Sequence, residues 1–327
     1  DRSVAVVAGT GGVGKTTVAA ALGIAAARRL DGEVLVLTID PARRLASALG
    51  IEISGNEAVH VPIADGSLLA AMLDPGLAWD SLVLTEAGDP ALADRILANP
   101  VYRRIADTFV QGNDYAALAW LDAALESDRY ELIIVDTPPS QNALDFFEAP
   151  GRVDEFFGST LLHWLTGGTS SSVVGTAAAK TFASVADRLL GAEFFADVVE
   201  FFQLMQSVVP GMVERTSAVA DQLAGDDAAF IAVTAPSVDV VERLGVLAES
   251  LEGRGLTFDG IVVNGVEPAM YGNPRVVDVA HRVVSGEKSP FSATTTALLA
   301  PGAEYVVERS HVAAAQRAAL GAIPATV

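Results

Sequence analysis

The 327-residue chain contains no cysteine. Disulfide bonds, and zinc or iron–sulfur sites that need thiolate ligands, are therefore excluded. Basic residues are also scarce, because 21 Lys and Arg stand against 41 Asp and Glu and give a formal net charge of -20 at pH 7. Such an acidic chain repels the phosphates of nucleic acids and of anionic lipids, and no basic patch interrupts the acidity. We expect no nucleic-acid partner.

Long apolar runs are missing as well. No segment has the roughly 18 uninterrupted apolar residues of a membrane span. The first residues run directly into a strand pattern, so we expect no signal peptide and a cytoplasmic location. Apolar residues nevertheless make up 51% of the chain, which is enough to build a large core. The composition predicts a globular protein.

Short apolar runs that end in a turn residue or a carboxylate predict strands. They cover residues 4–9, 33–40, 68–74, 131–136, 230–236 and 260–266. An Ala-rich helix with Leu22 and Ile24 on its inner side is expected after the first run, and a last edge strand is expected in residues 320–327. Alternating strands and helices predict an α/β fold with a doubly wound, mainly parallel sheet.

The glycine-rich stretch "GTGGVGKTT" lies between the first predicted strand and the first predicted helix. It matches the pattern G-x-x-x-x-G-K-[ST], in which main-chain N–H groups and the helix N-terminus bind phosphates. The lysine of this pattern reaches the β- and γ-phosphates, and the threonine hydroxyl binds Mg²⁺. We therefore predict a P-loop for ATP or ADP, with Mg²⁺ as cofactor, whose nucleotide-binding residues are Gly9, Thr10, Gly11, Gly12, Val13, Gly14, Lys15, Thr16 and Thr17.

Two carboxylates end predicted strands near this loop in the expected sheet. Asp136 closes "ELIIVD" at the position of a Walker B acid, which holds Mg²⁺ through water. Asp40 closes "EVLVLTID", where a carboxylate can contact Mg²⁺ and can orient or deprotonate the water that attacks the γ-phosphate. Together with Lys15, these are the predicted catalytic residues. A solvated helix face is the simpler interpretation for each of the next two arginines, Arg43 and Arg44.

Residues 75–129 and 147–228 show helical periodicity and no strand pattern. Both stretches are too long to be ordinary connections between strands. We predict that they form an inserted α-helical subdomain. The remaining residues, 1–74, 130–146 and 229–327, are predicted to form the P-loop nucleotide-binding core.

The motifs "GTGGVGKTT", "TIDPARRLASALG", "VDTPPSQNALDFFEAP" and "VVNGV", in this order and spacing, resemble those of the ArsA-type ATPases. That family includes arsenite-pump ATPases and the ATPases that target tail-anchored membrane proteins, and the likeness is greatest to actinobacterial-type anion-transporting relatives. The resemblance implies Mg²⁺-dependent ATP hydrolysis. It places the water-activating Asp40 in a first switch and Asp136 at the start of a second. It also assigns Asn264 to the adenine edge and Pro324 to an adenine-side loop.

The chain departs from this family pattern at Thr10. Relatives of one type carry a lysine there that reaches the partner's nucleotide across a dimer. Either that contact is absent in this protein, or another cation, Arg43 or Arg44, replaces it. The family's cysteines for arsenite and for a zinc clamp at the dimer seam are also missing. A homodimer, or a heterodimer with a paralogue, would therefore be held by apolar and polar contacts alone.

The leading interpretation is an ATP-hydrolysing switch whose nucleotide state moves the helical subdomain and controls binding of a protein client. Apolar residues at helical spacing in 153–165 and 194–212 form either a core between helices or a groove for a hydrophobic partner helix. The alternatives are the ATPase subunit of an anion efflux system with a membrane partner protein, a ParA- or MinD-like positioning ATPase, and a nucleotide-binding protein with little turnover.

Overall fold

A computed structural model describes residues 2–40, 44–108, 112–138, 149–158, 192–225, 227–253, 256 and 258–323 of the chain. Its strands form a seven-stranded sheet in the order β3-β4-β2-β5-β1-β6-β7. Strand β2 is parallel to β4 and β5, and β6 is parallel to β7, whereas β3 runs antiparallel to β4. The strands are β1 Val4–Ala8, β2 Glu33–Thr38, β3 Val59–His60, β4 Ser67–Met72, β5 Tyr130–Asp136, β6 Ala228–Thr234 and β7 Gly260–Val263.

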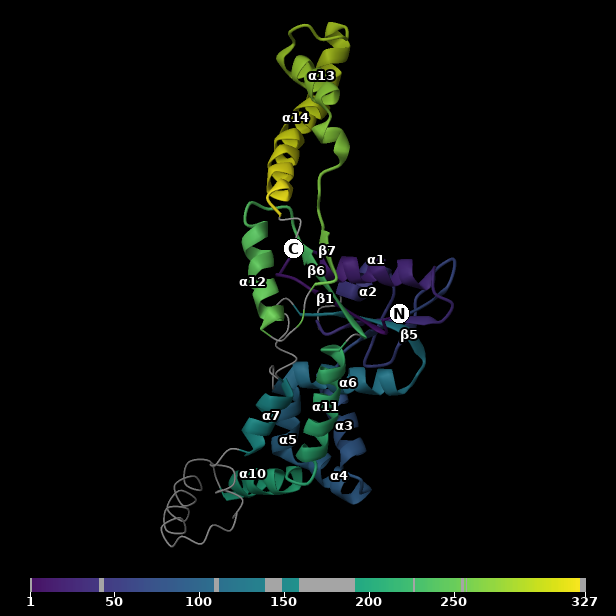
Figure 1. Ribbon diagram of the computed structural model, residues 1–327, viewed down its shortest axis with the longest axis vertical. Coiled ribbons are helices and arrows are strands. Elements are labelled where there is room, and N and C mark those ends of the chain that lie inside the picture. The colour runs from purple at the N-terminus through teal and green to yellow at the C-terminus, as the bar shows by residue number, and fades with distance from the viewer. Residues whose placement is uncertain are drawn as a thin grey trace. The chain divides into compact units, whose positions relative to one another are not determined.

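Helices alternate with these strands and also form most of the described parts of the two long stretches between them (Figure 1). The α/β fold with a mainly parallel sheet is therefore confirmed. The helices are α1 Lys15–Ala27, α2 Arg44–Leu49, α3 Pro75–Glu86, α4 Pro90–Ala98, α5 Pro100–Thr108, α6 Gly112–Glu126, α7 Ala149–Gly158, α10 Ala192–Met205, α11 Val209–Leu223, α12 Val240–Glu252, α13 Pro274–Ser285 and α14 Ala293–Gly321, with a short 3₁₀ helix η2 at Ala269–Gly272.

The six strands predicted from apolar runs are all present, each within a few residues of its expected limits. The two-residue strand β3 was missed because two residues are too few to show an alternating pattern. The edge strand expected in residues 320–327 is wrong over the part that the structure describes. Helix α14 continues to Gly321 and ends in a right-handed turn at Ala322, because the Ala-rich stretch before it favours continued helix.

The buried face of α1 consists mostly of small residues, with Val18, rather than of the expected Leu22 and Ile24. Ala19, Ala20 and Ala27 are at most 4% exposed, whereas Leu22 and Ile24 are only half-buried. A Cβ added at Gly23, on the same face, would stand 2.4 Å from a methyl group of Val36 in β2. The backbone of α1 therefore packs directly against the sheet. The apolar residues of its sequence alone did not predict this close packing.

The chain divides into two compact units, which are described separately. The first comprises Asp1–Val6, Ala19–Pro138 and Ala143–Ala229, and the second comprises Val7–Val18, Pro139–Asn142 and Phe230–Val327. In the first unit, helices α3, α4, α5, α6, α7, α10 and α11 pack on one another (Figure 1). The division into a nucleotide-binding core and an inserted helical subdomain stays a prediction.

The apolar segment 194–212 forms core where the structure describes its side chains in detail. Phe201, Met205, Val208 and Met212 are each at most 1% exposed. The rings of Phe201 and Phe202 meet edge to face, with centroids 4.9 Å apart. These residues support the interpretation as a core between helices. Residues 159–165 of the other apolar segment lie outside the described residues.

In the second unit, α13 and α14 lie side by side beyond β7 (Figure 1). Their contact is built on Ala280, Val283 and Ala303, with Val306 and Val307 packed against them. Within the part of the chain that the structure describes, no helix combines the length and the apolar character needed to cross a bilayer.

Candidate functional site

Residues 9–14 form a loop between β1 and α1 in the second unit, and two of its glycines are required by close approach. A Cβ at Gly9 would stand 2.2 Å from the carbonyl oxygen of Val233 in β6. At Gly14, φ is +90° and a Cβ would stand 2.2 Å from the side-chain amide of Asn264. A side chain at Gly9 would collide with the main chain of β6, and the positive φ at Gly14 disfavours any other residue there. The glycines thus serve the loop's packing as well as its conformation.

Lys15, the first residue of α1, is only 6% exposed. Its Nζ donates hydrogen bonds to the carbonyl oxygens of Gly9 at 2.8 Å and of Thr10 at 3.3 Å. The loop therefore curls around the ammonium group, and the charge is held in place before any phosphate arrives. Thr16 is half-buried and Thr17 is exposed at the start of the same helix. That these residues bind phosphate and Mg²⁺ stays a prediction.

Asn264 follows β7 and contacts the phosphate loop within the second unit. Its Nδ2 donates to the carbonyl oxygen of Val13 at 2.9 Å, a bond between residues 251 positions apart. The structure thus brings this predicted site residue to the loop. Its contact with the adenine edge stays a prediction. Pro324, the other residue assigned to the adenine side, lies outside the described residues.

Arg243 is a neighbour of the loop that the sequence analysis missed. Its Nη1 donates to the Thr10 hydroxyl at 3.3 Å, and its Nε donates to Asp239 at 2.6 Å. Arg243 is in α12, and Asp239 is the N-cap residue that precedes this helix. Nothing in the sequence around Arg243 distinguishes it from a solvated helical residue, because only the position of α12 brings it to Thr10.

In the first unit, the predicted carboxylate Asp136 is fully buried at the end of β5. It is the register partner of Thr38 in β2, and the Thr38 hydroxyl donates to Asp136 Oδ2 at 3.0 Å. The same hydroxyl accepts the main-chain N–H of Asp40 at 3.3 Å. Thr38 therefore links the Asp136 carboxylate to the main chain of Asp40. Sequence analysis missed this residue because the link depends on strand register.

Asp40 is 9% exposed, just beyond β2. Its Oδ2 accepts a bond from Arg44 Nη1 at 3.1 Å, and the Arg44 side chain is 62% exposed. Arg44 therefore acts within the chain as the partner of Asp40. Arg43, the other candidate to replace a lysine at position 10, lies outside the described residues.

Replacing Thr38 by valine keeps the side-chain shape and removes the hydroxyl. We expect the free energy of unfolding to fall by about 1–2 kcal/mol, because the buried Asp136 carboxylate loses a donor. Urea denaturation measures this change. Thr234→Val is the matched control, since Thr234 is also buried at a strand end but its hydroxyl makes only a 3.5 Å contact with the carbonyl oxygen of Ala235. Equal losses in the two variants would contradict the proposed linking role.

The residues present fit Mg²⁺ rather than a metal with an all-protein ligand set. No group of three or more His, Cys, Asp or Glu that could hold a metal occurs among the described residues. Mg²⁺ keeps several waters and is commonly bound by one or two carboxylates plus substrate phosphates. The oxygen donors of Thr16, Asp40 and Asp136 match that preference.

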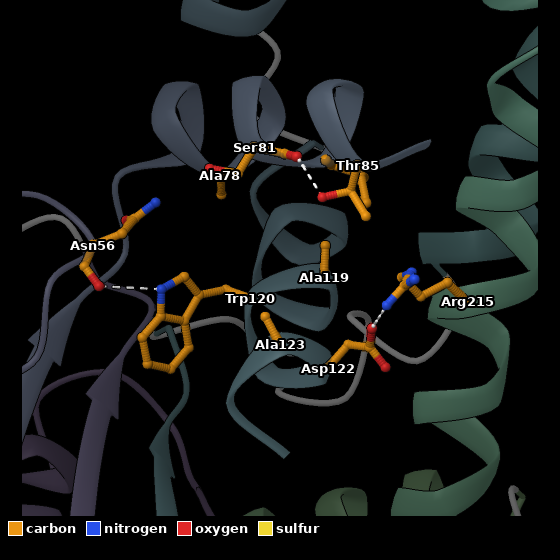
Figure 2. Close-up of a pocket in the computed structure, with 10 residues that line it drawn as sticks. Asn56, Ala78, Ser81, Thr85, Ala119, Trp120, Asp122, Ala123 and Arg215 are labelled. Carbon is orange, nitrogen blue, oxygen red and sulfur yellow. Dashed lines mark hydrogen bonds and ion pairs between the residues drawn. The ribbon is translucent and has the colours of Figure 1, made fainter. Parts of the chain in front are cut away.

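A separate hollow of about 220 Å³ opens among α3, α6 and α11 of the first unit (Figure 2). The polar groups that line it already form hydrogen bonds within the protein. The Trp120 indole donates to the carbonyl oxygen of Asn56 at 3.2 Å, and the hydroxyls of Ser81 and Thr85 donate to main-chain carbonyls at 2.9 Å. Since these groups are satisfied without a ligand, we assign the hollow no part in the candidate site.

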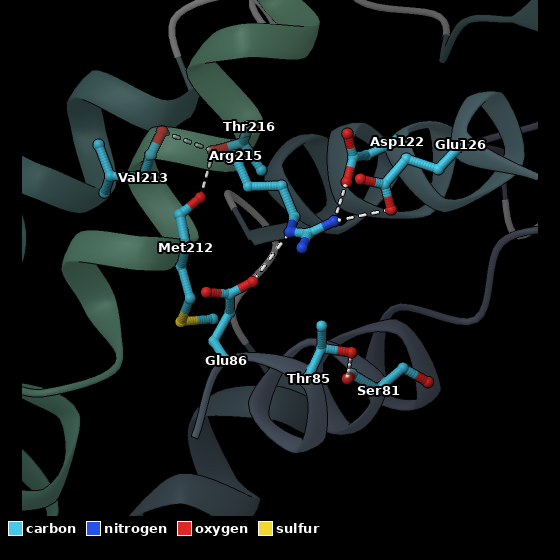
Figure 3. A network of polar contacts seen from close by, with 9 residues as sticks. All are labelled: Ser81, Thr85, Glu86, Asp122, Glu126, Met212, Val213, Arg215 and Thr216. Atoms are coloured by element: carbon cyan, nitrogen blue, oxygen red, sulfur yellow. Dashed lines mark hydrogen bonds and ion pairs between the residues drawn. The ribbon is translucent and has the colours of Figure 1, made fainter. Parts of the chain in front are cut away.

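Two residues that line this hollow, Asp122 and Arg215, belong to an ion-pair network centred on Arg215 of α11 (Figure 3). Arg215 donates to Glu86 of α3 at 2.8 Å, and to Asp122 and Glu126 of α6 at 2.6 and 3.0 Å. The bond with Asp122 raises the pKa of the Arg215 guanidinium above its ordinary range. Burial raises the pKa of Asp122, and Arg215 opposes that shift. The network connects three helices through a single cation.

Comparison with known proteins identifies one family and several relatives. A family model described as "Anion-transporting ATPase" matches residues 2–278. The protein named "ATPase get3" of Schizosaccharomyces pombe is 30% identical over 152 residues, which is 46% of this chain and 44% of the relative. "ATPase get3" of Aspergillus terreus is 31% identical over 147 residues, 44% of this chain and 42% of the relative. The chain thus matches less than half the length of these curated relatives.

Proposed function

Because the chain belongs to the ArsA-type anion-transporting ATPase family, we propose that it hydrolyses ATP to ADP and phosphate with Mg²⁺. One observation carries the proposal. The ammonium of Lys15 is buried and held by two carbonyl oxygens of the glycine-rich loop. An ammonium fixed in this way at a helix N-terminus is arranged to receive phosphate oxygens.

The proposed roles follow from the chemistry of each side chain. Main-chain N–H groups of residues 9–17 bind the phosphates, and Lys15 binds the β- and γ-phosphate oxygens. Asp40 orients the attacking water and accepts its proton. The oxygen of that water bonds to the γ-phosphorus while the bond from this phosphorus to the oxygen bridging to the β-phosphate breaks. Arg44 Nη1 donates to Asp40 Oδ2 at 3.1 Å and so helps to hold this carboxylate in one orientation.

Bound Mg²⁺ would neutralise charge on the β- and γ-phosphate oxygens. We assign the Thr16 hydroxyl as its direct ligand, Asp136 as a ligand through water, and Asp40 of the first switch as a further ligand. Thr38 holds Asp136 in one orientation through its 3.0 Å hydrogen bond. Asn264 is proposed to face the adenine edge, because it already contacts the loop at Val13.

Phosphate release from Mg-ATP tests the proposal. We expect steady release by the wild-type protein, and loss of release when EDTA removes the metal. Asp40→Asn should lower the rate by about 100-fold or more, since an amide cannot accept the proton of the attacking water.

Asp278→Asn is the matched control for Asp40→Asn. Both carboxylates accept from an arginine four residues later, but Asp278 lies on the exposed part of α13. Its replacement should leave the rate unchanged. A wild-type protein that binds ATP and releases no phosphate would replace the hydrolase proposal with that of a nucleotide-binding protein.

We further propose that nucleotide state controls binding of a protein partner. The family membership and the relatives named ATPase get3 support the ATPase part of this proposal. A second copy of the chain is the simplest partner, and without cysteine its interface would rest on apolar and polar contacts. Light scattering of the protein with ADP and with a non-hydrolysable ATP analogue tests this. An unchanged mass in both states would contradict nucleotide-driven dimerisation.

A further inference from the structure

Arg243 of α12 is held beside the phosphate loop by two bonds. Its Nη1 donates to the Thr10 hydroxyl at 3.3 Å, and its Nε donates to Asp239 at 2.6 Å. Because a guanidinium is planar, two bonds to different atoms set its orientation as well as its position. The group is thus presented to the loop in a defined direction.

Thr10 marks the end of the loop where the terminal phosphate is expected. The Lys15 ammonium, which in this motif reaches the β- and γ-phosphates, donates to the Thr10 carbonyl oxygen at 3.3 Å. The main chain of Thr10 therefore contacts one cation and its hydroxyl contacts another. Thr10 therefore contacts both Lys15 and Arg243.

Arg243 can also donate hydrogen bonds to an incoming anion. The two bonds engage Nε and Nη1, and no bond from Nη2 is found among the described residues. The side chain is 42% exposed, so turning toward a phosphate displaces little buried surface. In a chain of net charge -20, a second cation beside Lys15 reduces the repulsion that a triphosphate meets.

We propose that Arg243 binds the γ-phosphate of ATP and gives the protein its preference for ATP over ADP. The inference rests on the proposed ATP-binding function and adds a residue to it. In the bound state, Arg243 Nε still donates to Asp239 while the Nη groups donate to γ-phosphate oxygens. A charge-assisted bond of this kind exists with ATP and is absent with ADP, which lacks the γ-phosphate.

Calorimetric titration with Mg-ADP and with a magnesium complex of a non-hydrolysable ATP analogue tests the proposal. We expect Arg243→Ala to weaken binding of the analogue by about tenfold or more, while the affinity for ADP changes by less than about twofold. Arg243→Lys should fall between wild type and Arg243→Ala, because it keeps the charge and loses the planar donors.

Arg282→Ala is the matched control. Arg282 also pairs with an aspartate four residues earlier, and the pair is about half exposed on α13. Its replacement should change neither affinity. If Arg243→Ala weakens both nucleotides equally, or neither, the inference is overturned although nucleotide binding stands. A wild-type protein that binds neither nucleotide would overturn the ATPase proposal itself.

Discussion

Lys15→Ala is expected to lower the rate of ATP hydrolysis by at least about 100-fold, the usual cost of removing one preorganised donor from developing negative charge. The ammonium is 6% exposed and already held by the carbonyl oxygens of Gly9 and Thr10. No other side chain on the loop carries a positive charge that could take its place. Phosphate release measured at saturating Mg-ATP, together with nucleotide affinity, checks the result.

Two further variants separate the effect of position from the effect of charge. Lys15→Arg should also be inactive, because a planar guanidinium cannot occupy the enclosed place of an ammonium between two carbonyl oxygens. Lys288→Ala makes the same change of charge in an exposed turn and should leave the rate unaltered. Substantial hydrolysis by Lys15→Ala would mean that the loop does not bind the reacting phosphates.

Arg215→Met is expected to lower the free energy of unfolding by about 2–3 kcal/mol. Arg215 is 29% exposed, and its partners Glu86 and Asp122 are 15% and 13% exposed. Without the cation, two largely buried carboxylates from different helices would face each other unpaired. The third partner, Glu126, is 64% exposed and contributes little because water screens it. Urea denaturation followed by circular dichroism measures the loss.

Arg95→Met is the matched control for this loss. Arg95 forms a single ion pair with Glu200 at 2.6 Å, and the two side chains are 61% and 44% exposed. Its removal should cost less than about 0.5 kcal/mol. Adding Asp122→Asn to Arg215→Met should restore part of the stability, because it removes one unpaired charge. Equal losses from Arg215→Met and Arg95→Met would show that the network carries no special stability.

Most of the fold was predictable because its signals are local. Apolar runs ended by Asp40, by Asp136 and by the glycine loop marked strands, and the predicted helical stretches are mostly helix where the structure describes them. The failures occurred where a local signal was weak or misleading. Strand β3 is too short to show a period, and the end of α14 was mistaken for an edge strand.

The candidate site divides in the same way. The P-loop pattern places Gly9, Gly14, Lys15 and Thr16 within one turn and the start of one helix, so spacing alone locates them. Thr38 and Arg243 could not be found in this way. Thr38 meets Asp136 across 98 positions through the register of β2 and β5, and Arg243 meets Thr10 across 233 positions through the placement of α12.

The sequence by itself therefore determined the α/β class, the phosphate loop and the family resemblance, because each depends on residues that lie close together along the chain. Only the tertiary structure decided which side chains support them. It paired Asn264 with the loop, Thr38 with Asp136, Arg44 with Asp40 and Arg243 with Thr10. Three of these four pairs depend on strand register and helix placement, which the packing of the whole chain sets and which no short motif encodes.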